Sequence, residues 1–343
     1  MKKLIDKNDS FFVAGHNGMV GSAIIRELKR KGYCSKKNKG KLYIQSKKEL
    51  DLTDNDKVRD WFKSNRPSVV ILAAAKVGGI LANNSYPYDF LSENLKIQQN
   101  VIEAAWKNGA KRLLFLGSSC IYPKYSKTPI NEEELLTGSL ENTNEAYAIA
   151  KIAGIKLCES LIKQHNFDCI CLMPTNLYGQ NDNYHQKNSH VVPALIRKFF
   201  KASLENKPTV ECWGTGKPLR EFLHVDDLAA GCIHSLEYWN PIGEFALKNK
   251  NDKLLNYLNI GSGIEISIKE LAYLISDCIG YKGKIIWDES KPDGTFKKNL
   301  DSSRIQSLGW EPKIGLKEGI KKTIEDFKSK YLKGEESIKN FVN

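Results

Sequence analysis

A short apolar run, a glycine-rich turn and an amphipathic segment follow one another near the start of this chain, and they restrict its fold more than any other feature. Residues 11–14 are typical of a buried strand, and 22–31 have a helical periodicity that stops at Gly32. The turn between them reads Gly15-His16-Asn17-Gly18-Met19-Val20-Gly21. Glycines let the backbone approach a pyrophosphate at a helix N-terminus. A dinucleotide-binding turn is therefore predicted, although the spacing departs from G-x-G-x-x-G and a turn without a ligand is the alternative.

Strand and helix patterns alternate through the first half of the chain. Apolar runs predict strands over 41–45, 68–74, 112–116 and 168–173, and helical periodicity predicts helices over 94–107 and 147–164. This alternation is typical of an α/β fold, a Rossmann-like doubly wound parallel sheet. We expect this dinucleotide-binding domain to span 1–180.

The pattern changes after about Tyr178, which predicts a smaller C-terminal substrate-binding lobe. We assign it residues 181–224 and 261–343, with a return crossing to the first domain near 225–260. Helices are expected over 191–202 and 225–238, the second capped by Asp226 or Asp227, and a strand over 256–260. From Ser267 onward the chain is expected to be helical, with a Pro-Asp-Gly turn at 292–294.

The composition limits the classes of protein to which this chain can belong. Of 343 residues, 41% are hydrophobic and 27% are charged, as in ordinary globular domains. No apolar run approaches the ~20 residues that span a bilayer, and Asp6, Lys7 and Asp9 interrupt any signal sequence, so a cytoplasmic protein without membrane contact is expected. The eight cysteines show no C-x-x-C spacing, so neither a disulfide framework nor a metal site is expected.

The net charge of +12 suits either nucleic acid or small anionic substrates. Most of the excess is lysine in short clusters, which are typical of a solvated surface. Arginine is scarce and is the better bidentate ligand of phosphate, so Arg197 and Arg220 are the more interesting cations. We expect a nucleotide partner rather than nucleic acid.

Tyr147 and Lys151 are four residues apart on a predicted helix and therefore share a face. An ammonium beside the phenol favours the phenolate, which would lower the tyrosine pKa from about 10. Such a tyrosine exchanges protons with a carbonyl or alcohol near neutral pH. The spacing alone is weak, and an exposed helical pair is the alternative.

Candidate polar groups also lie beyond the fourth strand. Ser118 and Ser119 end this strand at the carboxyl edge, where ligands bind in such sheets, and Cys120 follows them. A small buried residue is the alternative for Cys120. Of the six histidines, His190 is the best acid or base candidate, whereas His224 is expected to be structural.

The second strand bears on the choice of cofactor. It is followed by Lys47 and Lys48, with no acid before Glu49 to bind ribose hydroxyls, so NADPH is favoured over NADH. Asp51 either reaches the adenine or caps a helix at Asn55.

Longer motifs resemble the GDP-L-fucose synthase family of the extended short-chain dehydrogenases/reductases. The glycine turn, Ser118 and Tyr-x-x-x-Lys resemble the superfamily, and the run from Trp213 to Asp227 is similar to its sugar-nucleotide branch. The closer family resemblance is carried, in order along nearly the whole chain, by residues 14–21, 73–80, 116–124, 147–159, 173–179, 188–190 and 291–295.

The resemblance implies inversion of C3 and C5 of GDP-4-dehydro-6-deoxy-D-mannose and reduction of C4 with NADPH. The matching reductase triad is Ser118, Tyr147 and Lys151, and the matching epimerisation pair is Cys120 and His190. Cofactor positions would be the glycine turn, Lys47, Leu116, Gly117, Ser118, Ser119, Lys151, Pro174, Thr175, Asn176, Leu177 and His190. Positions near the GDP-sugar would be Lys198, Trp213, Arg220 and Asp293.

Some features depart from the family or leave alternatives. Family members often carry Arg at the positions of Asn17 and Lys47, and the 35–40 turn is longer than usual, which puts the adenosine end in doubt. Alternatives are a 4-epimerase with bound NAD, an enzyme of another deoxy sugar, and a non-catalytic dinucleotide-binding regulator that contacts RNA. The superfamily often pairs through helices that match 94–107 and 147–164, so a homodimer is expected.

Overall fold

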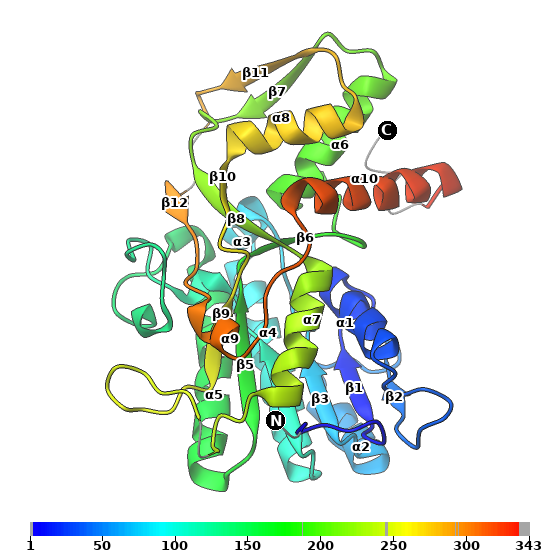
Figure 1. Ribbon diagram of the computed structural model, residues 1–343, viewed down its shortest axis with the longest axis vertical. Helices are drawn as coiled ribbons and strands as arrows, with labels where there is room; N and C mark the ends of the chain where they lie inside the picture. Colours follow the sequence, from blue (N-terminus) through cyan, green and yellow to red (C-terminus); the bar gives the residue numbers. More distant parts are fainter. Residues whose placement is uncertain (1–2, 187, 244–245, 292, 294, 336–343) are drawn as a thin grey trace.

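The computed structural model of the chain describes residues 3–186, 188–243, 246–291, 293 and 295–335. Within them, six parallel strands form one sheet in the order β2-β1-β3-β4-β5-β9 (Figure 1). They are β1 Phe11–Ala14, β2 Leu42–Tyr43, β3 Val69–Leu72, β4 Arg112–Leu116, β5 Cys169–Pro174 and β9 Tyr257–Ile260. Because β1 lies between β2 and β3, winding reverses there, and such a switch point is where open α/β sheets bind ligands. The predicted fold class is confirmed.

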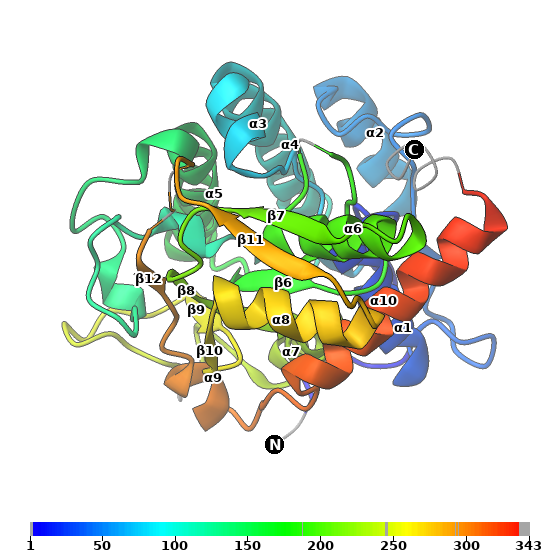
Figure 2. The ribbon, with the colours of Figure 1, turned by 90° about the horizontal axis from the view of Figure 1, so that it is seen from above.

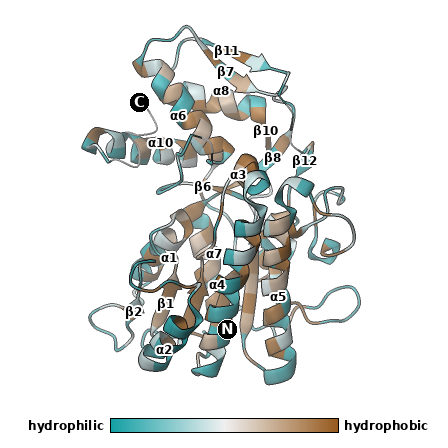
Figure 3. Ribbon diagram, turned by 180° about the vertical axis from the view of Figure 1, so that it is seen from behind, coloured by the Kyte–Doolittle hydropathy of each residue, from teal (hydrophilic) through white to brown (hydrophobic). Residues whose placement is uncertain are grey.

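Helices cover both faces of this sheet. One face carries α2 Asn55–Asn65, α4 Pro87–Lys107 and α5 Glu145–His165, and the other carries α1 Met19–Arg30 and α7 Val225–Tyr238. Every residue of β1, β3, β4 and β5 is buried, because side chains alternate between the two covered faces. The continuous apolar runs of the sequence reflect this double coverage, and Figure 3 shows the hydrophobic strands behind helices with polar outer faces.

The remaining elements form a smaller layer over the carboxyl ends of the strands. In the described part of the chain, β8 Leu219–His224 pairs with β6 Asn176–Tyr178, β10 Glu265–Ser267 and β12 Lys297–Lys298, and β7 Thr209–Trp213 pairs with β11 Lys284–Asp288. Helices α6 Val191–Leu204, α8 Ile268–Ile279 and α10 Leu316–Lys333 share a hydrophobic cluster with β7 and β8. Helix α10 lies alongside α8 (Figure 2).

Short elements complete the chain at the junction and the edges. They are α3 Ile80–Ser85, α9 Ser303–Ser307 and the 3-10 turns η1 Ser119–Ile121, η2 Glu132–Glu134 and η3 Asn142–Asn144. Among the described residues, no helix is both long and apolar enough to cross a membrane.

Several expected boundaries differ from the structure. The Gly32 signal is confirmed, because α1 ends at Arg30 and Gly32 has φ +76°. Helix α4 begins at Pro87 rather than Asn94, since proline is favoured in a first helical turn. Strand β2 is limited to 42–43. The helical segment expected from Ser267 onward is confirmed in part by α8, α9 and α10, but β11 and β12 interrupt it through pairing with distant strands.

One predicted helix cap is wrong, and the capping alternative for Asp51 is excluded. Helix α7 is capped by His224, whose Nδ1 accepts the N–H of Asp226, so neither acid is the cap. Helix α2 is capped by Asp54 rather than Asp51. The turn at 292–294 lies outside the described residues except for Asp293. Elements α7 and β9 lie with the six-stranded sheet, and the domain boundaries stay a prediction.

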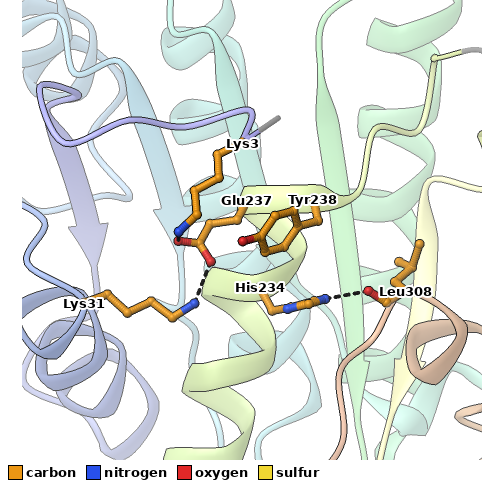
Figure 4. A pocket seen from close by; sticks show the side chains of 6 residues that line it. All are labelled: Lys3, Lys31, His234, Glu237, Tyr238 and Leu308. Carbon is orange, nitrogen blue, oxygen red and sulfur yellow. Dashed lines mark hydrogen bonds and ion pairs between the residues drawn. The ribbon is translucent and has the colours of Figure 1, made fainter. Parts of the chain in front are cut away.

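A buried carboxylate fastens the N-terminal segment to the far end of α7, beside an open pocket (Figure 4). The Glu237 side chain is fully buried and accepts hydrogen bonds from Lys3 at 2.6 Å, Lys31 at 2.5 Å and Tyr33 at 2.7 Å. Burial would raise the pKa of Glu237, but these three donors outweigh it and hold the pKa below its usual range. The cluster joins α1 to α7 at the end of the sheet opposite the glycine turn.

We predict that Glu237→Gln destabilises the protein by about 2 kcal/mol, because it removes the charge that three donors share. Because the pKa of Glu237 is lower in the folded state than its unfolded value of about 4.3, the ionised carboxylate stabilises the folded protein above that pH. This contribution is lost as the pH falls through the folded-state pKa. The difference in Tm between wild type and variant should therefore shrink in acid. Glu318→Gln, which breaks the exposed pair with Lys322, is the control. Equal effects of the two substitutions would contradict the prediction.

Candidate active site

The glycine turn is shaped by close backbone approaches. A Cβ on Gly21 would lie 2.2 Å from the Gly15 carbonyl oxygen, and one on Gly15 would lie 2.7 Å from the Ala74 nitrogen. Gly15 also has φ +86°, which side chains disfavour. Gly18 precedes α1 without a side-chain cap, and the first turn of α1 carries no acid. The first N–H groups of α1 are therefore available to an anion such as a pyrophosphate.

The end of β2 leaves cations rather than acids for a ligand. Glu49 turns back to accept the N–H of Ser46 at 2.7 Å, and Asp51 accepts from the Thr53 backbone and hydroxyl. These bonds from Thr53 lower the pKa of Asp51, and the nearby Lys47 ammonium adds to the effect. Lys47 and Asn17 are exposed. This arrangement fits a 2′-phosphate better than free ribose hydroxyls.

The end of β4 and the start of α5 bring together four of the predicted catalytic side chains. Lys151 is buried, and its Nζ donates to the carbonyl of Leu116, the last residue of β4, at 2.8 Å. Ser118 follows two residues later and accepts the N–H of Cys120 at 3.2 Å. The Ser118 side chain also hydrogen-bonds Tyr147. Gly117 packs closely against Met173, since a Cβ at Gly117 would lie 2.3 Å from the Met173 sulfur.

The ionisation of this cluster differs from the sequence prediction. Burial raises the pKa of Tyr147, the neighbouring Cys120 raises it further, and only the Ser118 hydrogen bond lowers it. Burial lowers the pKa of Lys151 to about 8. The expected lowering of the tyrosine pKa by lysine is therefore wrong for this chain, because burial outweighs any such effect. The Tyr147 hydroxyl stays protonated at neutral pH.

Asn144 is a site residue that sequence reasoning missed. Its Nδ2 donates to the Cys120 sulfur at 3.5 Å, and its Oδ1 has no hydrogen-bond partner among the described residues. It immediately precedes α5, as its N-cap residue. The sequence signal that could have indicated it is its position three residues before Tyr147, at the start of the helix that carries this tyrosine.

His190 stands on a different element from Cys120. It is the N-cap residue of α6, with no side-chain capping bond, and its carbonyl accepts the N–H of Ala194 at 3.0 Å. His190 is exposed to solvent as a residue. Nearby protein atoms still desolvate its imidazole, and this desolvation lowers the pKa of the ring. Within the described ranges, no hydrogen bond joins it to Cys120. The loop before His190 contacts α3, which in turn contacts η3 and so Asn144.

The predicted substrate residues gather over the carboxyl end of the first sheet. Lys198 lies over the exposed Trp213 ring, 5.4 Å from its centroid. Burial lowers the pKa of Arg220, and the nearby Asp293 acts in the opposite direction. Asp293 itself accepts from the Thr215 N–H at 3.0 Å and hydroxyl at 2.7 Å. An exposed aromatic ring and two cations are a suitable surface for a nucleoside diphosphate.

Two other predicted positions serve mainly to join segments. Arg197 is buried, and its guanidinium donates to the carbonyls of Tyr184 and Gln186, so it holds a loop rather than a phosphate. In the segment 174–177, Thr175 and Asn176 both donate to the carbonyl of Glu221 on β8. This segment therefore leads from the first sheet directly into the smaller layer.

All eight cysteines lie in the described part of the chain as free thiols, and Cys169 and Cys171 are buried as expected. Among the residues that the structure describes, no group of three or more metal-binding side chains is assembled.

Comparisons with known proteins agree with this geometry. The sequence model of the NAD dependent epimerase/dehydratase family matches residues 11–244. The chain is 52% identical over 322 residues to a putative GDP-L-fucose synthase 2 of Arabidopsis thaliana, covering 94% of this chain and 92% of the relative. It is also 52% identical to GDP-L-fucose synthase of Escherichia coli K12, covering 92% and 95%.

Solved structures show the same likeness. A GDP-mannoheptose C4 reductase from Campylobacter jejuni with NADP bound has 38% identity and a TM-score of 0.82, covering 94% of this chain and 99% of that one. A GDP-L-fucose synthetase from Naegleria fowleri bound to NADP has 27% identity and a TM-score of 0.82, covering 96% of each chain. With its glycine turn, its Ser-Tyr-Lys cluster and these relatives, the chain belongs to the GDP-L-fucose synthase family of the extended short-chain dehydrogenases/reductases.

Proposed function

We propose that this chain converts GDP-4-dehydro-6-deoxy-D-mannose to GDP-L-fucose by inverting C3 and C5 and then reducing C4 with NADPH. The observation that carries the proposal is the cluster of Ser118, Cys120, Tyr147 and Lys151 beside a dinucleotide turn. A reductase alone needs the serine, tyrosine and lysine. The thiol in the same cluster supplies a second kind of proton-transfer group, which suits a site that also epimerises.

The residues around the glycine turn fit NADP(H). The N-terminus of α1 would hold the pyrophosphate, and Lys47 would pair with the 2′-phosphate, because the neighbouring acids already accept hydrogen bonds from backbone N–H groups. When bound, NADPH supplies a hydride for C4. The segment 174–177 and Lys151 complete the nicotinamide side of the site.

Epimerisation uses the acidity that the C4 ketone gives to the protons on C3 and C5. Cys120 removes a proton as the thiolate, the electrons pass into an enolate, and His190 returns a proton to the opposite face. Free thiol and imidazole have pKa values of about 8.5 and 6.5, so both exchange protons near neutral pH. Asn144 orients the Cys120 sulfur through its amide N–H.

Reduction uses the raised pKa of Tyr147. The phenol stays protonated and donates to the C4 oxygen as that oxygen gains charge, while Ser118 holds the oxygen in place. Lys198, Trp213, Arg220 and Asp293 hold the GDP portion above the reacting sugar. Their exposed ring and cations meet the guanine and the diphosphate.

We predict that wild-type protein in deuterated water turns this substrate and NADPH into GDP-L-fucose with deuterium at C3 and C5, identified by NMR. Cys120→Ser should slow C3 and C5 exchange by roughly 10²–10⁴-fold, because a hydroxyl is too weakly acidic to act as this base. Oxidation of GDP-L-fucose by NADP⁺, which needs no epimerisation, should persist. Cys278→Ser, at another half-buried thiol, is the control. Wild-type exchange in Cys120→Ser would remove Cys120 from this role.

We predict that Tyr147→Phe lowers the rate of C4 reduction by roughly 10²–10⁴-fold, because the proton donor is lost. NADPH binding, followed by fluorescence, and C3 and C5 exchange should both continue. Tyr125→Phe is the matched control, since the Tyr125 side chain is exposed. Substantial residual reduction by Tyr147→Phe would refute its assignment as the donor.

We also predict a homodimer that pairs through α4 and α5. These long helices lie side by side on one face of the sheet and expose Leu95 and Ile149, which are 36% and 44% accessible. Sedimentation velocity should give the mass of two chains, and Ile149→Glu should shift it toward one. A single-chain mass for the wild type would overturn this assembly.

A further inference from the structure

The connection after β3 reaches across to the segment that carries His190. The N–H of Gly79 donates to the carbonyl of Asn188 at 3.1 Å. Gly79 belongs to the connection between β3 and α3, whereas Asn188 lies two residues before His190 at the start of α6. Helix α3 lies where the two layers of the chain meet (Figure 1). This hydrogen bond therefore joins the dinucleotide-binding sheet to the helix of the epimerisation histidine.

Buried amides hold the Gly79 end of this link in place. Asn83 is buried and donates from one Nδ2 to the carbonyls of Gly78 and Gly79, at 2.7 and 3.0 Å. Asn94, also buried, bonds both the N–H and the carbonyl of Lys76. The 76–79 backbone is thus fixed to α3 and α4, and it offers a rigid support rather than a mobile loop.

Gly79 has no room for a side chain, for a reason that concerns the His190 segment alone. A Cβ there would lie 2.8 Å from the carbonyl oxygen of Ser189, well inside van der Waals contact. The backbone of Gly79, with φ −67° and ψ 179°, suits any residue. The absence of a side chain is therefore not required by the backbone conformation of Gly79 itself. It is required by the close approach of Ser189, the residue before His190.

The same connection also touches the reductase side of the site. A Cβ on Gly78 would lie 3.1 Å from the Phe90 ring, and Phe90 packs edge-on against Tyr147 with centroids 6.3 Å apart. The glycine pair thus lies between the tyrosine and the histidine. The backbone of residues 78–79 is therefore in position to set the distance between Tyr147, which serves reduction, and His190, which serves epimerisation.

We propose that Gly79 is a positioning residue for His190, which fixes the imidazole at the distance from the sugar that proton return requires. The proposal rests on the acid role of His190 in the proposed function. Misplacing a catalytic group by about 1 Å can lower a rate roughly 100-fold, so displacement of the Ser189 carbonyl should be felt at the imidazole. Hydride transfer, which depends on Tyr147, should be affected far less.

The test compares Gly79→Ala with Gly315→Ala. Gly315 is also a helix N-cap glycine, with φ −63°, but nothing lies within 4 Å of an added Cβ, so it is a matched control. Deuterium incorporation with inversion at C3 and C5 should slow roughly 100-fold in Gly79→Ala, because Cys120 alone can exchange these protons but His190 returns one to the opposite face. Oxidation of GDP-L-fucose by NADP⁺ and NADPH affinity should stay within about threefold of wild type, and Gly315→Ala should match wild type throughout.

Further variants keep the result decisive. Asn83→Ala removes the amide that holds Gly79 without introducing a clash, and it should slow inversion in the same selective way but by less. It replaces Gly79→Ala if that variant does not fold. Slow inversion in His190→Ala with normal inversion in both Gly79→Ala and Asn83→Ala would overturn this inference. Normal inversion in His190→Ala would instead overturn the proposed role of His190.

Discussion

The buried ammonium of Lys151 determines how the reactive groups of this protein are placed. It lies in the interior and donates to the final carbonyl of β4, so the helix that carries it cannot slide along the sheet without leaving a charge unpaired. Tyr147 is one turn earlier on that helix, and Ser118 is two residues beyond that carbonyl. A single hydrogen bond thus brings a helix face and a strand end into register. The cost of burying the ammonium appears as a lowered lysine pKa.

Most of the first sheet could be predicted from the sequence because its information is local. Continuous apolar strands, a glycine turn and a glycine after α1 each act over a few residues, and each is found where expected. The Ser118, Cys120, Tyr147 and Lys151 cluster was predictable for a related reason. Ligands gather at the carboxyl edge of such sheets, and that edge follows directly from the strand assignments.

What escaped prediction depends on contacts between distant segments. Strands β11 and β12 form because they pair with β7 and β8, and the local periodicity of the sequence does not predict such short strands. The direction of the Tyr147 pKa shift depended on how deeply the ring is buried, which a four-residue spacing does not specify. The role of His190 stays a prediction, and the support of its loop by Gly79 needed the three-dimensional structure.

Strand β8 has a consequence for how the chain acquires its structure. It pairs with β6, β10 and β12, and its buried Glu221 carboxylate accepts the N–H groups of Gly263 and Leu300. These partners are spread from residue 176 to residue 300, so the sheet is incomplete until almost the entire chain has left the ribosome. Pairing at such sequence separation is slow because long loops must close first. During synthesis, the six-stranded sheet can gather its first strands early, while β8 stays without its last partners until the C-terminal segment arrives.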